Sequence, residues 1–467
     1  MRPGSRARIP GWRGGAAGWH PMDSPQISQS PNTIRTTCAK AERVSVSLMI
    51  TTRAGQRNLL RNLKADGRGG LPRIPILIGL LLALAITVLF SALHGFLDLQ
   101  VYRVDTRGWL EHGTLYGPTL PVAGHTDLPF TYPPSAAVLM IPLAIMPLWL
   151  AEFLVTASSL ACLGVTTWLV LSRVRPDLDP RTKITLSVAA VVVAVAIEPV
   201  RTTLWFGQIN LVLMAAVALD CLTEKPRWPR GVLIGVAAVT KLTPAAFVLY
   251  LLIRRDWKAA GTATATAFGI VGAGFLLFPQ ESRDYWLHAI VDTNRIGSPD
   301  YVGNQSLKGM MYRLGPSHTT ATILWLGVGL AVVCAGAALM HHLFTIERAN
   351  AATPPITILS VIALLVNAAV LLLISPVSWT HHWVWAVPAL VTAAAWTTTT
   401  PSRTPYATIA VFATLFLIGP GLVPNGGHPA HHRSWWQHVP GDVYPIATIT
   451  LLTFALTRLP RLRPRPH

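Results

Sequence analysis

Long apolar runs, separated by short polar segments, dominate this chain of 467 residues. Hydrophobic residues make up 51% of the chain and charged residues 12%, whereas a soluble domain carries about 25% charged residues. A run of about 20 apolar residues crosses the hydrocarbon core of a bilayer as a helix, because every backbone group must be hydrogen-bonded within the segment. The sequence therefore predicts an all-α, polytopic bundle of transmembrane helices.

Two of the apolar tracts contain residues that interrupt a helix. The tract 134–172 includes Pro142 and Pro147, and could form one crossing with a shallow segment or two crossings. The tract 232–253 has Lys241 and Pro244 near its middle, which indicates two half-helices. We expect about twelve crossings, with a range of roughly ten to thirteen. The candidate spans are 75–95, 134–172, 184–200, 206–222, 232–253, 259–278, 319–343, 355–374, 382–396, 406–423 and 441–458.

The basic residues next to these spans predict the orientation of the chain. Loops rich in Lys and Arg remain in the cytoplasm. Such loops are residues 57–73, 173–183, 225–230, 254–258 and 458–465, so both termini are expected inside a plasma-membrane protein. The opposite, extracytoplasmic side then receives residues 96–133, 201–207, 279–318, 375–381 and 424–440.

The ends of the chain differ from its centre in composition. Residues 1–74 are basic and rich in Gly, Pro and Ser, which predicts a disordered cytoplasmic tail or a start assigned too far upstream, with Met49 as the alternative. Residues 75–460 would form the transmembrane domain, and 461–467 a second basic tail. The net charge of +18 could indicate a nucleic-acid partner. However, the basic residues are concentrated beside the apolar spans, which is typical of membrane topology, so no nucleic-acid partner is expected.

Several kinds of chemistry have no signature in the sequence. The four cysteines are scattered without metal-ligand spacing, so neither zinc nor a disulfide framework is indicated. There is no GxxxxGK[ST] motif and no soluble segment approaching the size of a nucleotide-binding domain. If the protein is a transferase, a lipid must present its donor, and no cofactor or divalent metal is expected.

Polar side chains of chemical interest gather on the predicted outer side. Asp98 follows the first span and could act as a general base, with Asp105 as the second choice; either could instead pair with Arg103 or Arg107 to stiffen a loop. The shared position indicates one outward-facing site, supplied with a substrate that arrives through the lipid. The other residues of chemical interest predicted on this side are Tyr102, Tyr132, Gln208, Asn210, Asn304, Gln305, Arg313, Trp379, His381 and His382.

Lys241 is the exceptional residue within a span. A lysine at that depth costs about 2.5–3.5 kcal/mol, so it should meet an anion, either Glu198 or a phosphate of a lipid-linked substrate. His381 and His382 could bind a metal, cap a helix or donate to phosphate, and metal is least favoured because no carboxylate lies nearby in sequence. The amides could bind sugar hydroxyls or cap broken helices, and Trp379 could stack on a sugar or belong to an interfacial aromatic belt.

Several short motifs occur in the order found in a known family. They are Asp98-Leu-Gln-Val-Tyr102 with Gly113-Thr-Leu-Tyr116 and Phe130-Thr-Tyr-Pro-Pro134, then Gly207-Gln-Ile-Asn210, Gly235 through Lys241-Leu-Thr-Pro244, Asn304-Gln-Ser306 and Ser375 through His382. Over residues 75–460 the chain resembles the actinobacterial polyprenol-phosphate-mannose-dependent α-1,2-mannosyltransferases. The resemblance does not extend to the N-terminal tail.

The resemblance implies a GT-C fold with a structured first extracytoplasmic loop. It also implies transfer of mannose, with inversion, from polyprenyl-phosphate-mannose to a lipid-anchored acceptor such as phosphatidylinositol mannoside, lipomannan or lipoarabinomannan. Asp98 would be the base, with Asp105 the second choice. Lys241, His381, His382 and Arg313 would bind the donor phosphate, and Gln208, Asn210, Asn304, Gln305, Trp379 and Tyr102 the sugars. A transporter or flippase of a lipid-linked sugar is the alternative, although no internal repeat supports it.

Overall fold

The computed structural model describes residues 73–93, 95–117, 128–350, 356–398, 404–423 and 434–458. The chain divides into Met1–Gly70 and Leu71–His467, and the description below concerns the second unit. The predictions for the tails, 1–74 and 461–467, fall outside the described residues except at Arg73 and Ile74. Within the described ranges every regular element is helical, and one isolated antiparallel bridge joins Asn304 to Trp379. The all-α prediction is confirmed.

The helices follow the predicted spans closely in position. The elements of the first part are α2 (Arg73–Ala92), α3 (Leu97–His112), α4 (Pro134–Ile145), α5 (Leu148–Val174), α6 (Pro180–Ala194), α7 (Glu198–Phe206), α8 (Asn210–Leu222), α9 (Val232–Thr240), η1 (Thr243–Ala246), α10 (Phe247–Arg254) and α11 (Trp257–Leu277). Those of the second part are α12 (Pro279–Arg283), the π-helical turn η2 (Asp284–Ala289), η3 (Thr293–Ile296), α13 (Leu307–Arg313), α14 (His318–Ala349), α15 (Ile358–Ile374), η4 (Thr380–Trp385), α16 (Ala386–Thr397), α17 (Thr404–Ile418), η5 (Gly419–Leu422), η7 (Trp435–Gln437), α18 (His438–Gly441) and α19 (Val443–Arg458).

Both interrupted tracts are broken, the first at Pro147 and the second at Lys241, whereas Pro142, the other interruption expected in the first tract, lies inside α4. The first tract forms two helices, since α4 ends at Ile145 and α5 begins after Pro147. In the second tract α9 ends at Thr240, Lys241 has an extended backbone, and η1 leads into α10. This break removes Lys241 from a continuous helix, so its neighbours are set by tertiary packing.

The number of crossings stays a prediction. Three described helices are long and apolar enough to span a membrane (α5, α11 and α14), and up to six spans result if each of three sharply bent helix pairs counts as one. The bent pairs are α2 with α3, α6 with α7, and the η7–α18 segment with α19, and each bends by 75–77°. Five further apolar helices contain 10–17 residues.

Two clusters of buried apolar residues hold the described helices together. The larger cluster joins α2, α5, α8, α10, α14, α15 and α16. The smaller cluster lies within the first predicted outer loop, where the aromatic side chains of Tyr102, Trp109, Phe130 and Tyr132 pack against α4. This second cluster gives the loop a packed interior, which supports the prediction that it is structured.

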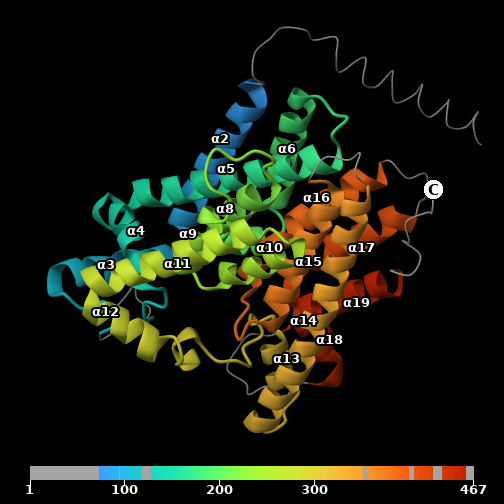
Figure 1. Ribbon diagram of the computed structural model, residues 1–467. Coiled ribbons are helices and arrows are strands. Elements are labelled where there is room, and N and C mark those ends of the chain that lie inside the picture. The colour runs from blue at the N-terminus through green and yellow to red at the C-terminus, as the bar shows by residue number, and fades with distance from the viewer. Residues whose placement is uncertain are drawn as a thin grey trace, which may run out of the picture. The chain divides into compact units, whose positions relative to one another are not determined.

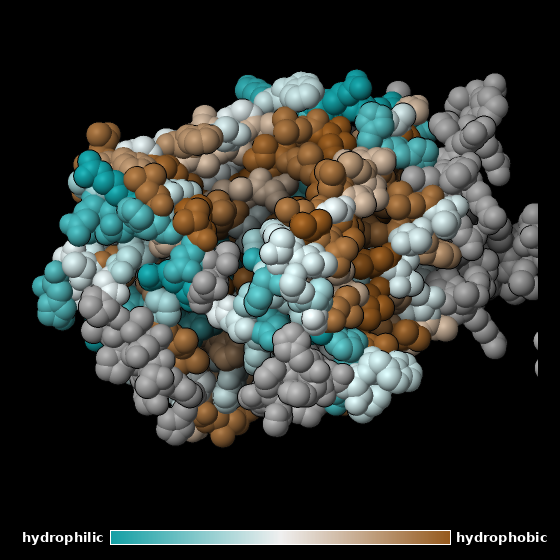
Figure 2. All heavy atoms as spheres, turned by 90° about the horizontal axis from the view of Figure 1, so that it is seen from below, coloured by the Kyte–Doolittle hydropathy of each residue, from teal (hydrophilic) through white to brown (hydrophobic). Residues whose placement is uncertain are grey.

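The segments assigned to the outer side meet at one end of the unit. Backbone hydrogen bonds join Phe96 to Trp205 and Gln305 to Ser378, and Arg313 pairs with Asp442. In Figure 1 α12, α13 and α18 lie on the lower side and α3 lies at the left, all of them away from α6 near the top. Figure 2 views that lower face and shows hydrophilic residues across it, most densely on the side of α3 and α12, between hydrophobic patches.

Candidate active site

Asp98 is positioned by two tight turns that lie against each other. Phe96, with left-handed backbone at φ 63°, precedes α3, and Gly207, at φ 67°, ends α7. A Cβ at Gly207 would come 2.8 Å from the Cβ of Leu99, so only glycine permits this approach. The approach lets Gln208 Nε2 donate a 2.6 Å hydrogen bond to Asp98 Oδ2.

Two tyrosines extend this contact into a network. The hydroxyl of Tyr132 donates to Gln208 Oε1 at 3.0 Å and lies 2.9 Å from the hydroxyl of Tyr102. Both tyrosines are buried, whereas Asp98 is only partly buried. Gln208 is therefore held at both ends of its amide, and the Asp98 carboxylate is oriented while remaining accessible.

Lys241 reaches the same network from the break between α9 and η1. Its Nζ lies 3.0 Å from Asn210 Oδ1, 3.1 Å from His382 Nε2 and 5.3 Å from the centroid of the Tyr132 ring. An amide, an imidazole and an aromatic face thus surround the ammonium, and Lys241 as a whole is 8% exposed. Within the described ranges no carboxylate lies at ion-pair distance from Lys241, so its charge can serve an incoming anion.

Glu198, the alternative partner of Lys241, is engaged elsewhere. Its carboxylate accepts hydrogen bonds from the hydroxyls of Tyr444 at 2.6 Å and Thr202 at 2.7 Å. The expectation of a Lys241–Glu198 ion pair is therefore wrong, because these hydroxyls fix Glu198 against α19.

The two adjacent histidines have different positions. The backbone carbonyl of His381 accepts from Thr203 Oγ1 and Asn210 Nδ2, both at 2.9 Å, and its ring packs edge-on against Phe206. These bonds fix η4 against α7 and α8. They hold His382, which is half-buried, beside Lys241.

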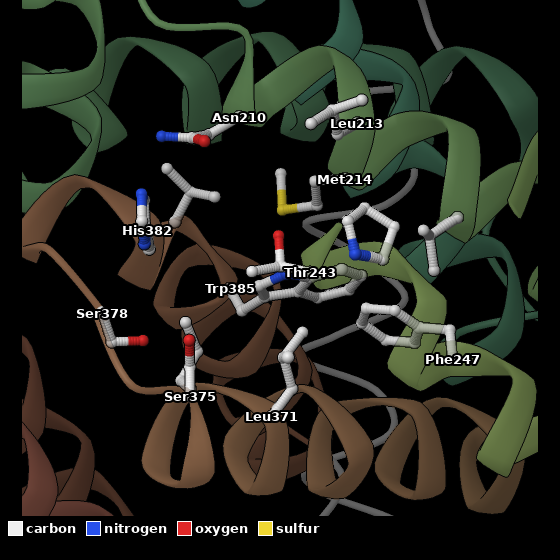
Figure 3. A pocket seen from close by; sticks show the side chains of 14 residues that line it. Asn210, Leu213, Met214, Thr243, Phe247, Leu371, Ser375, Ser378, His382 and Trp385 are labelled. Carbon is white, nitrogen blue, oxygen red and sulfur yellow. The ribbon is translucent and has the colours of Figure 1, made fainter. Parts of the chain in front are cut away.

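A cavity opens next to this group of polar residues. Asn210 and His382 line one side of it, and the opposite wall is apolar, formed by residues such as Met214, Phe247 and Leu371 (Figure 3). The hydroxyl of Ser378 also faces this cavity and has no hydrogen-bond partner among the described residues. The cavity thus combines a polar side next to the Lys241 ammonium with apolar walls between α8, α10 and α15.

Other predicted site residues are engaged in holding the fold together. Arg313 is 1% exposed and donates to Asp442 Oδ1 and to the carbonyl of Tyr301. This buried ion pair fixes α13 to the junction between α18 and α19, and none of the contacts of Arg313 reaches Lys241. The guanidinium is already satisfied by Asp442, so the geometry favours a structural role over binding the donor phosphate.

The amides of Asn304 and Gln305 are also saturated by backbone groups. Asn304 Nδ2 donates to Pro299 and Pro376 carbonyls, and its Oδ1 accepts from Ser378 N at 2.9 Å. Gln305 Nε2 donates to the carbonyls of Val302 and Gly441, while its Oε1 accepts from Tyr444 N. Trp379 packs edge-on against Tyr301. These three residues link the 279–318 segment to η4 and α19, and the structure does not join them to Asp98.

Asp105 lies two helical turns beyond Asp98 on α3 and shares no hydrogen bond with the Gln208 network. Tyr132, by contrast, is central to the network and is absent from the predicted sugar-binding set. Its position within the Phe130–Pro134 motif was the signal that could have identified it. Within the described ranges no three His, Cys, Asp or Glu side chains converge to hold a metal, and reaction without a metal remains a prediction.

The carboxylate of Asp98 and the ammonium of Lys241 thus belong to one polar network within an apolar helical bundle. The family model described as "Glycosyltransferase family 87" matches residues 130–376. The chain is 40% identical over 311 residues (64% of this chain, 69% of the relative) to a polyprenol-phosphate-mannose-dependent alpha-(1-2)-phosphatidylinositol mannoside mannosyltransferase of Mycolicibacterium smegmatis. It is 32% identical over 411 residues (84% and 91%) to the protein of the same name from Mycobacterium tuberculosis.

A more distant relative is an alpha-(1->3)-arabinofuranosyltransferase of Corynebacterium glutamicum, 28% identical over 44% of this chain and 49% of the relative. No solved structure matches the chain. The chain belongs to glycosyltransferase family 87 and is a membrane glycosyltransferase.

Proposed function

We propose that this protein is an α-1,2-mannosyltransferase that transfers mannose from polyprenyl-phosphate-mannose to a lipid-anchored mannoside on the extracytoplasmic face of the plasma membrane. The acceptor would be phosphatidylinositol mannoside, or the related lipomannan and lipoarabinomannan. The names of the two relatives above support the donor, the linkage and the acceptor. The single observation that carries the proposal is the hydrogen-bond network of Asp98, Gln208 and Tyr132, with the Lys241 Nζ 5.3 Å from the centroid of the Tyr132 ring.

This geometry suits direct displacement at the anomeric carbon. The 2-hydroxyl oxygen of the acceptor would form a bond to C1 of the donor mannose as the bond from C1 to the phosphate oxygen breaks. The hydroxyl proton passes to Asp98, and the prenyl phosphate leaves with the bonding electrons. Because the nucleophile and the leaving group occupy opposite faces of C1, the configuration inverts from β to α.

The surroundings of Lys241 suit the leaving group. An ammonium in a site with little water stabilises the charge that develops on a departing phosphate more strongly than it would in solution. His382 provides a second polar contact 3.1 Å from the ammonium. The apolar walls of the adjacent cavity match an isoprenoid chain, so the donor phosphate could bind at Lys241 with the lipid beside α8 and α15.

The decisive experiment compares substitutions of Asp98 in the full-length protein in membranes. Asp98→Asn keeps an oxygen that can accept from Gln208 but removes the base, so transfer from polyprenyl-phosphate-mannose should fall by roughly 10²–10⁴-fold. Glu111→Gln, an exposed change at the far end of α3, is the matched control and should retain wild-type activity.

Linkage analysis of the product then tests the reaction itself. A new 2-linked α-mannose is expected, and transfer by Asp98→Asn at the rate of the control would refute the role of Asp98. Movement of the lipid-linked sugar into vesicles without a glycosidic product would instead favour the transporter.

A further inference from the structure

Ser378 places a buried hydroxyl in the cavity beside His382. The residue is 1% exposed, and its Oγ lacks a hydrogen-bond partner among the described residues. Figure 3 shows this oxygen pointing from the chain into the cavity, on the side where His382 lies. A buried hydroxyl without a hydrogen bond destabilises a fold. The direction of the hydroxyl therefore indicates a group that binds in the cavity.

The backbone on either side of this hydroxyl is fixed by the Asn304-Gln-Ser306 motif. Ser378 N donates to Asn304 Oδ1 at 2.9 Å, and the Ser378 carbonyl accepts from Gln305 N at 2.7 Å. The antiparallel bridge joins Asn304 to Trp379, the next residue in the chain. These bonds leave the side chain only the rotation about its Cα–Cβ bond, so the hydroxyl is held at the cavity before a ligand arrives.

A neighbouring serine shows that this availability is specific to Ser378. Ser375, three residues earlier, lines the same cavity, but its Oγ donates to the carbonyl of Val377 at 2.8 Å. The hydroxyl of Ser375 is thus used within its own turn. The hydroxyl of Ser378, in contrast, stays available to a ligand.

The cavity surrounds the Ser378 hydroxyl with groups that suit a lipid phosphate. His382 lines the cavity and its Nε2 lies 3.1 Å from Lys241 Nζ, so a cation lies next to the polar side. From that side an apolar wall continues along α8, formed by Leu213, Met214 and Val217. A ligand that matches both parts has an anionic oxygen at one end and a hydrocarbon chain at the other. A hydroxyl that donates to such an oxygen forms a short, charge-assisted hydrogen bond.

We propose that Ser378 donates a hydrogen bond to the phosphate of the lipid-linked donor and of the prenyl phosphate that leaves. The inference rests on the proposed function, in which Lys241 binds the same phosphate. Lys241 comes from the break between α9 and η1 and Ser378 from the segment before η4, so the two can bind different oxygens. The ammonium neutralises charge, and the hydroxyl fixes the orientation of the phosphate relative to the chain in the cavity.

The test measures ligand binding by the full-length protein in lipid nanodiscs, using titration calorimetry without mannosyl donor or acceptor. The probe is farnesyl phosphate, while farnesol lacks its phosphate and inorganic phosphate lacks its chain. The wild type should bind farnesyl phosphate more tightly than either. Ser378→Ala removes a hydrogen bond to a charged group, so it should weaken this binding by about 10–100-fold and leave farnesol binding within about two-fold. Ser378→Cys keeps the shape but is a weak donor, so it should act in the same direction.

Ser159→Ala is the matched control. Ser159 is 0% exposed and its Oγ also lacks a partner among the described residues, but it lies on α5, outside the cavity. Both alanine variants remove a buried hydroxyl that has no hydrogen bond, so each Tm should equal or exceed that of the wild type. Only Ser378→Ala should weaken farnesyl phosphate binding. It should also raise the KM for the donor while leaving the KM for the acceptor within about two-fold.

Binding in the absence of reaction separates this proposal from the proposed function. Weaker binding of farnesyl phosphate by Ser378→Ala and Ser378→Cys supports the role of Ser378 even if the wild type transfers no mannose. Binding by Ser378→Ala within two-fold of the wild type rejects that role even if transfer occurs. An equal affinity of the wild type for farnesyl phosphate and farnesol would also overturn the proposal, as would an equal loss of binding in Ser159→Ala.

Discussion

Replacing Lys241 by methionine tests whether its charge serves catalysis or the fold. Methionine has a similar length but no charge. Burying the lysine costs about 2.5–3.5 kcal/mol, and removing it leaves the buried Asn210 Oδ1 without its donor, which costs about 1–3 kcal/mol. These contributions oppose each other, so Lys241→Met should change the free energy of unfolding by no more than about 2.5 kcal/mol.

The effect on turnover should be much larger. A single preorganised charge at a developing anion contributes about 10²–10³-fold to kcat, or about 3–4 kcal/mol. In the proposed reaction that anion is the departing prenyl phosphate. Lys241→Met should therefore lower kcat by this factor while the protein remains folded.

The assay measures transfer of labelled mannose by purified protein, with Tm recorded on the same sample. Lys308→Met is the matched control, because the Lys308 ammonium also lies over aromatic rings, 5.7 Å from the centroid of Tyr312 and 5.3 Å from that of Trp325, but outside the site. The control should keep its kcat. A kcat for Lys241→Met within three-fold of the wild type would refute the reasoning, as would a loss of activity that follows a fall in Tm.

Two further substitutions test the supports of the site. Arg313→Met leaves Asp442 buried and unpaired and should destabilise the protein by about 3–5 kcal/mol, seen as a lower Tm, with kcat per folded molecule unchanged. A loss of kcat at unchanged Tm would restore Arg313 as a donor-binding residue. Gly207→Ala adds left-handed strain of about 1–2 kcal/mol and a Cβ that displaces Leu99. It should lower both Tm and kcat, because Gln208 moves away from Asp98, and wild-type kinetics would show that this turn does not position the base.

The local interruptions of the apolar tracts were predictable from the sequence. Pro147 separates α4 from α5, and Pro244 lies four residues after Thr240, where α9 ends, since a proline ring clashes with the carbonyl four residues before it and disrupts the helix there. The collection of polar segments at one end was also predictable, because the lengths of the apolar tracts and their basic flanks constrain which loops lie together.

The division of the polar residues into reactive and structural ones could not be predicted in the same way. Asn210 and Asn304 look alike in sequence, as polar amides at the edges of apolar tracts, yet Asn210 Oδ1 meets Lys241 while Asn304 binds backbone groups. Likewise Arg313 pairs with Asp442. The two residues are too far apart in the chain for the sequence to predict this pair. Hydrogen-bond partners depend on which segments pack together.

The amino-acid sequence alone determined an all-helical membrane protein whose polar segments gather at one end, because the burial of apolar runs acts over short distances along the chain; the side of the membrane that each loop faces stays a prediction from loop charge. Only the tertiary structure decided that Asp98 meets Gln208, that Lys241 meets Asn210 and His382, and that Asp105 remains without a hydrogen-bond partner for Oδ2 among the described residues. Such contacts join residues up to 141 positions apart, and their geometry is set by helix packing.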